Sequence, residues 1–348
     1  MGYDVTRQGL GWTLFFFALL LLLFWKHSLA EPVPFDPLSA GDMPLGTVLA
    51  GVARRLPVFS GILSALLAFA GAVVLTRIVS RNMILLERTY MPILLYPAVG
   101  CSAYFGPESL PALAASFLTI ASFDTMLVSF RRTARFGSLF NATILAGAAL
   151  LVWSHTIVYV LLLPFALVVF KRSGREWIVA WVGMLLPLAI CSYIEWGTGR
   201  SFLGPVSRLW EGVRGAFAGP GFDLPTIRPA LWVFWSMCLT VTVLSLVALW
   251  RRSGTMRTRA YKSSVYFLWI LFFSLLPLAA PGRATTALVL PAAPLAAALR
   301  VVCRRWENPW LGLSAGRPSI FEAKAIVKCA RSVPEPLFLR LLLRADHA

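Results

Sequence analysis

Long apolar runs alternate with short polar segments along almost the whole chain. Residues 110–130 form one such run, which carries Asp124 as its one carboxylate and is followed by Arg131 and Arg132. A run of about 20 apolar residues is long enough to cross the roughly 30 Å hydrocarbon core of a bilayer as a helix. The alternation of apolar run and cationic cluster recurs along the sequence and predicts a polytopic membrane protein.

The pattern predicts an all-α integral membrane helix bundle of about ten transmembrane helices. Residues 136–170 must hold two of them, because one helix of that length would measure about 52 Å. We therefore expect a hairpin that turns near His155, which we interpret as a polar residue at the membrane interface. The ten runs cover residues 9–25, 57–76, 90–105, 110–130, 136–152, 157–170, 176–196, 229–250, 264–280 and 285–303.

The first run, residues 9–25, has two interpretations. Ser28, Leu29 and Ala30 offer small residues at a potential cleavage site, as in a secretory signal peptide. Bulky and charged residues crowd that site, so we expect a helix that is retained in the mature protein.

The charge distribution predicts the orientation in the membrane. Of the 32 Lys and Arg, 24 fall on one side of the predicted spans and eight on the other. Because excess cations face the cytoplasm, both termini are expected there, and loops 26–56 and 197–228 are expected outside. The net charge of +17 therefore reflects membrane topology rather than nucleic-acid binding. A bacterial inner (cytoplasmic) membrane is the expected location, with the lipid bilayer as partner.

The chain divides into a transmembrane bundle, residues 1–303, and a basic cytoplasmic tail, residues 304–348. Residues 336–344 are too short to span a membrane and place Arg340 and Arg344 on one helical face. They are expected either to lie as a helix in the cytoplasmic headgroup region or to dock on the protein's own loops.

Two polar residues are predicted inside the membrane. Asp124 lies seven residues before Arg131, and Asn141 lies six residues after Arg135 on the next helix, so both have a similar depth. A buried carboxylate needs a partner. Asp124 is expected either to bond Asn141 or extend toward Arg131, or else to serve an ion-linked or substrate-binding site.

The two outer loops contain the predicted functional residues. Carboxylates can deprotonate an acceptor hydroxyl or hold a divalent cation, and arginines bind phosphate. A site for a polyprenyl-phosphate sugar would need both carboxylates and arginines. Charged residues in aqueous loops can also simply be solvated, with no role in a site. The expected catalytic residues are Asp36 and Asp42, and the expected substrate-binding residues are Arg54, Arg55, Arg200 and Arg208.

No resident cofactor or metal is predicted. The five cysteines lie far apart and form no CxxC or Cys/His spacing of the kind that binds zinc. A divalent cation is expected only if the outer loops transfer sugars.

Residues 135–197, together with residues 76–97, resemble an uncharacterised family of multi-pass inner-membrane proteins of Bacteroidota. The shared marks are a helical hairpin, the turn Arg175-Glu176-Trp177, and then Gly183 and Pro187. This family has no established activity, so the resemblance implies none for this chain. In architecture, with an inside N-terminus and acids in the first outer loop, the chain is also similar to polytopic glycosyltransferases that use polyprenyl-phosphate sugars. Those enzymes place an acidic pair in that loop, whereas the acids here are isolated.

Three classes of function follow from these patterns. The first is an assembly or accessory membrane protein of the cell envelope, whose partners would be other envelope membrane proteins. The second is a glycosyltransferase that acts on a polyprenyl-phosphate lipid at the outer face. The third is a transporter or flippase: the sequence has no clear internal repeat and no pair of broken, polar helices, but the proline-broken spans at 176–196 and 285–303 leave this class open.

Overall fold

In the described part of the chain, every regular element of the computed structural model is helical. The predicted tail, residues 304–348 with the helix at 336–344, lies outside the described residues, as do parts of the bundle. The structure describes residues 14–15, 17–19, 43–81, 93, 96, 110–130, 136–217, 240, 243, 247 and 258–275.

Three helices are long and apolar enough to cross a membrane: α4 (Pro57–Arg81), α6 (Leu110–Ser129) and α9 (Gly174–Gly197). Two shorter apolar helices, α7 (Phe136–Val152) and α8 (Ile157–Val169), also occupy predicted spans. α12 (Thr258–Leu275) begins six residues before the predicted span 264–280. The other four predicted spans lie wholly or largely outside the described residues, so the count of ten and the sides of the termini stay predictions.

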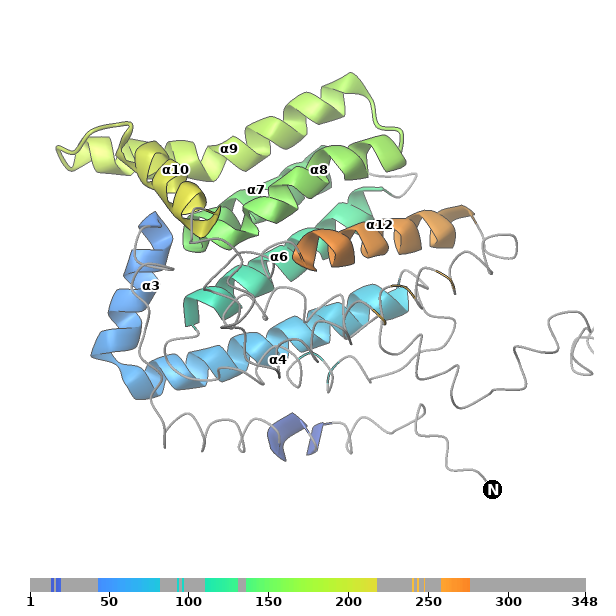
Figure 1. The fold of residues 1–348 in the computed structure, drawn as a ribbon, viewed down its shortest axis with the longest axis horizontal. Coiled ribbons are helices and arrows are strands. Elements are labelled where there is room, and N and C mark those ends of the chain that lie inside the picture. Colours follow the sequence, from blue (N-terminus) through green and yellow to red (C-terminus); the bar gives the residue numbers. More distant parts are fainter. Residues whose placement is uncertain are drawn as a thin grey trace, which may run out of the picture. The chain divides into compact units, whose positions relative to one another are not determined.

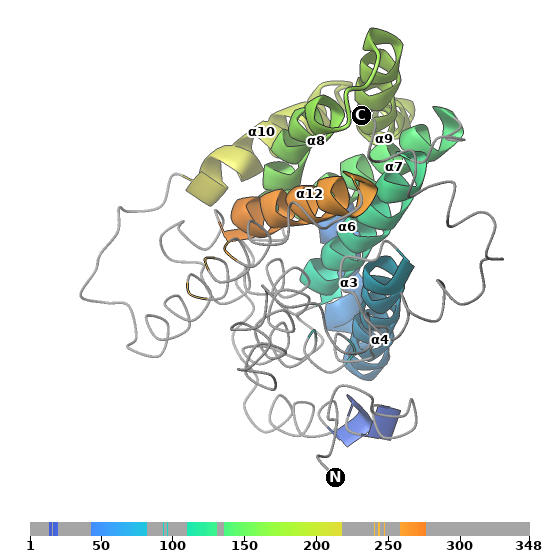
Figure 2. The same cartoon turned by 90° about the vertical axis from the view of Figure 1, so that its right-hand side faces the viewer.

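α6 lies in the middle of the described helices. It packs extensively against α4 on one side and α7 on the other, and α7 in turn packs against α9 (Figure 1 and Figure 2). Within the apolar windows, 61% of α6 is buried in the bundle, compared with 22% of α9. α6 is therefore a core helix, and α9 is a peripheral helix with a broad exposed face.

The predicted hairpin at residues 136–170 is confirmed. α7 ends at Val152, a 3₁₀ turn (η3) covers Ser154–Thr156, and α8 begins at Ile157. The ring of Phe170, at the end of α8, stacks on that of Phe130, at the end of α6, with centroids 3.8 Å apart. α8 therefore returns the chain to the end of the bundle from which α7 started.

Two glycines allow the backbones of α7 and α9 to approach closely. A Cβ built on Gly147 of α7 would overlap the Met184 carbonyl oxygen of α9. On the facing helix, a Cβ on Gly183 would lie 2.9 Å from Cδ2 of Phe140 and would overlap the Thr143 hydroxyl. Small residues at such crossings are the usual basis of tight helix packing in lipid.

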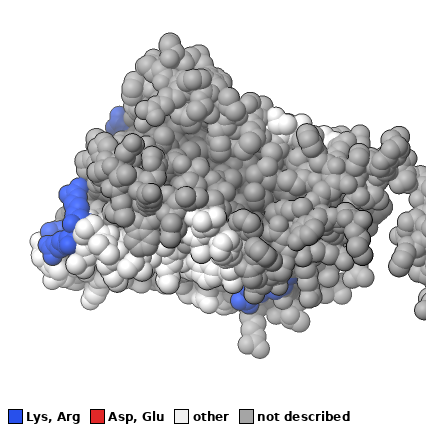
Figure 3. Space-filling view, turned by 90° about the horizontal axis from the view of Figure 1, so that it is seen from below, with Lys and Arg blue, Asp and Glu red and all other residues white. Residues whose placement is uncertain are grey.

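Exposed apolar side chains form ridges along the outer helices. On α9, Ile178, Val182 and Leu185 are 66%, 52% and 52% exposed, and the ridge continues to Ile194 near the helix end. α4 carries a similar ridge, and the described surface in Figure 3 is largely neither basic nor acidic, with Lys and Arg gathered in separate groups. Ridges at this helical spacing are the surfaces expected to contact lipid.

Each predicted outer loop contains an amphipathic helix that the sequence analysis did not identify. α3 (Pro44–Arg55) lies in loop 26–56, and α10 (Gly204–Phe217) lies in loop 197–228. Proline in the first turn of each helix is compatible with helix initiation, because the first N–H groups of a helix have no intrahelical partner. These loops are therefore partly structured surfaces rather than connections.

Candidate functional site

α3, α10 and the η3 turn meet at one end of the bundle, which we call the capped end. Met43, directly before α3, is 1% exposed. Its methyl group and sulfur lie against Gly212 of α10, and the Cβ of Ser154 in η3 lies 3.7 Å from a Cβ built on Gly212. The two outer loops are therefore joined to each other and to the hairpin turn.

The hairpin turn itself is sealed from the surface. Trp153, Ser154, His155 and Thr156 are each no more than 2% exposed, and the Thr156 hydroxyl donates to the Trp153 carbonyl at 2.8 Å. His155 lies against the indole of Trp153, with ring centroids 4.8 Å apart. His155 is therefore buried within the protein, because α10 packs over the turn, and its position at the membrane interface stays a prediction.

The structure places the predicted outer-loop residues in different surroundings. Asp36 and Asp42 lie outside the described residues. Arg54 and Arg55 are exposed in the last turn of α3, just before α4 begins. Arg200 is exposed after the end of α9. A catalytic role for the acids and a substrate-binding role for these arginines stay predictions.

Arg208 has a structural partner. Its guanidinium forms an ion pair with Glu195 at the end of α9, and its Nε donates to the Gly204 carbonyl at 3.3 Å. Arg208 therefore ties the first turn of α10 to α9. Glu195 closes a predicted span in the sequence, and only the fold of the outer loop brings an arginine to it.

At the opposite end, which we call the arginine end, Asp124 is paired with Arg81. Nη2 of Arg81 donates to Oδ1 of Asp124 at 3.0 Å, and the two side chains are 24% and 15% exposed. Asn141 is exposed on α7 and is not the partner that the sequence suggested. The apolar run ends at Thr76, but α4 continues to Arg81, which brings this arginine beside Asp124.

Arg172 joins three features of the arginine end. Its guanidinium donates to the Ser129 carbonyl at 2.8 Å, pairs with Glu176 at 3.0 Å, and lies 5.1 Å from the centre of the Phe130 ring. Glu176 also accepts from the Ser173 backbone N–H at 3.2 Å, which caps α9. The arginine therefore satisfies a carbonyl at the C-terminus of α6, where the last carbonyls of a helix lack partners.

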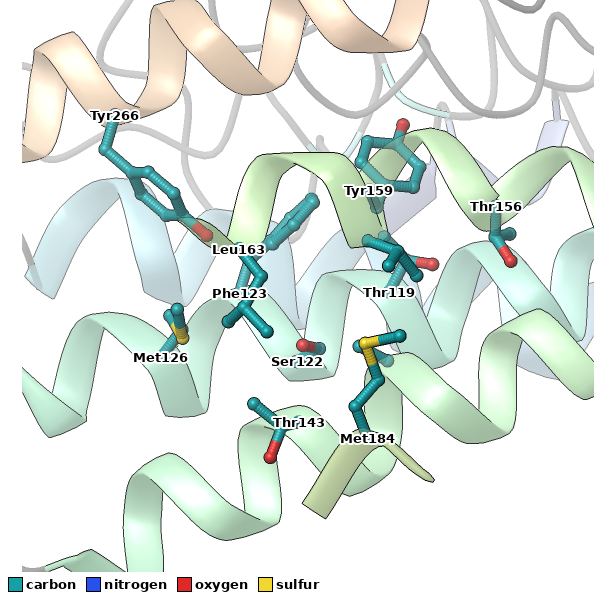
Figure 4. Close-up of a pocket in the computed structure, with 12 residues that line it drawn as sticks. Thr119, Ser122, Phe123, Met126, Thr143, Thr156, Tyr159, Leu163, Met184 and Tyr266 are labelled. Atoms are coloured by element: carbon teal, nitrogen blue, oxygen red, sulfur yellow. The ribbon is translucent and has the colours of Figure 1, made fainter. Parts of the chain in front are cut away.

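A small cavity lies between α6, α7, α8, α9 and α12 (Figure 4). It offers about 20 Å³ to the centre of a water-sized sphere, which is room for about one water molecule. In Figure 4, Tyr266 reaches from α12 toward Phe123 and Leu163, and Met184 lies across from it. The lining consists of Thr119, Ser122, Phe123, Met126, Thr143, Ala146, Thr156, Tyr159, Val160, Leu163, Met184 and Tyr266.

Hydroxyl groups provide the polarity of this cavity, and several of them are bonded to backbone carbonyls. Ser122 donates to the Ala142 carbonyl at 2.7 Å, which links α6 to α7. Thr119 donates to the Ala115 carbonyl at 2.7 Å, and Thr143 to the Phe140 carbonyl at 2.9 Å. A neutral lining of this size suits a bound water molecule better than an ionic substrate.

The described carboxylates serve mainly as structural partners. Asp124, Glu176 and Glu195 each pair with an arginine, and the fourth described carboxylate, Glu211, is exposed on α10. Within the described segments, no three His, Cys, Asp or Glu side chains gather as metal ligands would. The polar chemistry of these segments is therefore that of helix ends and helix contacts.

Comparisons with protein-family models, with curated proteins and with solved structures found no match to this chain.

Proposed function

We propose that the chain is a multi-pass assembly or accessory subunit of the bacterial inner membrane, within the cell envelope. The observation that carries this proposal is that three of the four described carboxylates pair with an arginine, and two of these pairs, Arg81–Asp124 and Arg208–Glu195, join two helices. The lipid-facing ridges and the cationic asymmetry of the sequence support a membrane location.

Mass spectrometry of the protein, purified gently from its native membrane, tests this proposal. We expect a protein partner at near-equimolar ratio, retained by wild type and by Arg55→Ala, because the side chain of Arg55 is exposed in the last turn of α3. An equimolar polyprenyl-phosphate or sugar lipid without a protein partner would contradict the proposal, as would bulk phospholipid alone.

A glycosyltransferase that uses a polyprenyl-phosphate sugar is the second candidate. The observation that favours it is the packing of Met43 against Gly212, which joins the two outer loops at the capped end. Asp42 directly precedes Met43 in the sequence. Loss of sugar transfer in Asp42→Ala at an unchanged protein level would support this candidate, with Asp36→Ala as the parallel variant; preserved activity in both would exclude these acids as catalysts.

A transporter or flippase is the third candidate, favoured by the hydroxyl-lined cavity and by the prolines Pro164 in α8 and Pro187 in α9. A substitution at Asp124 distinguishes the transporter from the assembly subunit proposed first. If Asp124 is a structural partner of Arg81, Asp124→Asn should lower the free energy of unfolding by about 1–2 kcal/mol, because it removes the negative charge that faces the guanidinium. Detergent unfolding measures this, with Asn141→Ala as the exposed control. Unchanged stability together with blocked transport would instead support the ion-linked role.

A further inference from the structure

α10 has three distinct faces. Pro205 and Gly212 are buried against the bundle, and Arg208 anchors this face to Glu195. Val206 and Trp210 are 39% and 68% exposed. A surface helix of a soluble domain has a protein face and a water face, whereas α10 also has an exposed apolar face, which suits contact with lipid.

The exposed surface of α10 is itself divided into an apolar and a polar half. At about 100° per residue, Val206 and Trp210 lie within roughly 40° of each other around the helix. Ser207, Glu211 and Arg214 are all exposed and group about a quarter turn away. A helix at a membrane interface has this division, with apolar residues toward the acyl chains and polar residues toward water.

The apolar half of α10 continues the lipid-facing ridge of α9. Tyr193 and Trp196, in the last turn of α9, are 66% and 60% exposed. The turn between the helices adds Phe202 and Leu203, which are 50% and 67% exposed. With 24 residues, α9 is about 36 Å long, so its last turn reaches beyond a hydrocarbon core of about 30 Å. This length allows α10 to begin at the depth of the lipid headgroups.

The composition of this surface matches that depth. Trp196 and Trp210 are both exposed, and tryptophan is enriched where hydrocarbon meets headgroups. Arg200 and Arg214 are exposed beside the apolar residues and carry charge that suits lipid phosphate. We infer that α10 is an interfacial helix whose Leu203, Val206 and Trp210 insert into the phospholipid surface at the capped end. The partner of this face is therefore lipid rather than protein.

Site-specific photocrosslinking in the native membrane tests this inference on the full-length protein. The photoreactive residue p-benzoylphenylalanine replaces Val206 or Trp210 on the apolar half, and Ser207 or Glu211 as matched controls on the polar half. We expect phospholipid adducts at 206 and 210 to be several-fold more abundant than at 207 and 211, measured by intact mass. Protein adducts at 206 and 210, or equal labelling at all four positions, would overturn the inference.

A second measurement avoids the bulky probe. Brominated phospholipids quench tryptophan emission on contact, so Trp210→Phe should remove a component of wild-type emission that these lipids quench. An unchanged quenched component in Trp210→Phe would overturn the inference even if a photoreactive variant failed to fold. Because the probe is lipid alone, this result is separate from whether a protein subunit copurifies.

Discussion

The two ends of the bundle hold their polar groups in different ways. At the arginine end, Arg81 and Arg172 turn toward the helices and bind a carboxylate and a helix-terminal carbonyl. At the capped end, the polar turn at Ser154–Thr156 is covered by apolar packing between Met43 and Gly212, and one ion pair, Arg208–Glu195, joins α10 to α9. Arg54 and Arg55 remain exposed there.

This difference teaches that one end of a helix bundle can rest mainly on charged contacts, whereas the other combines apolar packing with a single ion pair. A buried ion pair is sensitive to the loss of either partner, because the remaining charge is left in a medium of low dielectric constant. A packed cap is sensitive to volume and shape instead. The two ends should therefore respond differently to substitution. α9 runs from one end to the other, and its close contact with α7 at Gly147 and Gly183 lies between them.

The largest effect is expected at that shared contact. Gly147→Ala places a methyl group on the Met184 carbonyl oxygen, where backbone rather than a flexible side chain must move. We expect a loss of about 3 kcal/mol in the free energy of unfolding, and loss of both ends together. Gly137→Ala in the same helix meets nothing within 4 Å and is the control. Equal behaviour of the two variants in detergent unfolding would show that the crossing is not close-packed.

Arg172→Ala should break the arginine end alone. It removes the ion pair to Glu176, leaves the Ser129 carbonyl without this donor and removes the cation from the Phe130 ring. We expect a loss of about 2–3 kcal/mol in the free energy of unfolding. Arg175→Ala, an exposed arginine three residues later, should have little effect. Similar losses in both variants would point to net charge rather than to these contacts.

Gly212→Ala should disturb the capped end by a smaller amount. The added methyl group meets the flexible end of the Met43 side chain, which can move away. We expect a loss of about 1–2 kcal/mol and increased access of a water-soluble label to the η3 turn. Gly51→Ala in α3 has open space around it and should be neutral or slightly stabilising. A neutral Gly212→Ala would mean that α10 does not seal the turn.

The smallest changes in stability are expected from substitutions at the C-terminal ends of α8 and α9, which have the same hydrogen-bond pattern. α8 ends at the arginine end with Lys171 at φ +52°, and α9 ends at the capped end with Gly199 at φ +82°. In each, two backbone N–H groups bond back to the last turn, as in a Schellman motif. Lys171→Gly should stabilise the protein by about 1 kcal/mol, and Gly199→Ala should destabilise it by about 1 kcal/mol, because glycine tolerates positive φ. Changes of the same sign would contradict this account.

The sequence predicted the elements that depend on length and apolar pattern. The α7–α8 hairpin and the span at α6 follow from these alone, because hydrocarbon thickness sets helix length. It missed α3 and α10, since glycine and proline in their loops obscure a helix that is stabilised by packing on the bundle. It also missed the Arg81–Asp124 pair, because α4 extends five residues beyond its apolar run. Contacts between residues far apart in the sequence can be identified only once the fold is known.

The pairing of α7 with α9 has a consequence for the order of events during synthesis. α9 makes its extensive contacts with α7, although α8 lies between them in the chain and packs against α12. A ribosome releases α8 before α9, so the contact between Gly147 and Met184 can form only after α9 has been synthesised. The early neighbours α6 and α7 can associate first, joined by the Ser122 hydroxyl. After the short connection at 170–173, α9 packs against a face of α7 that α8 must therefore leave uncovered.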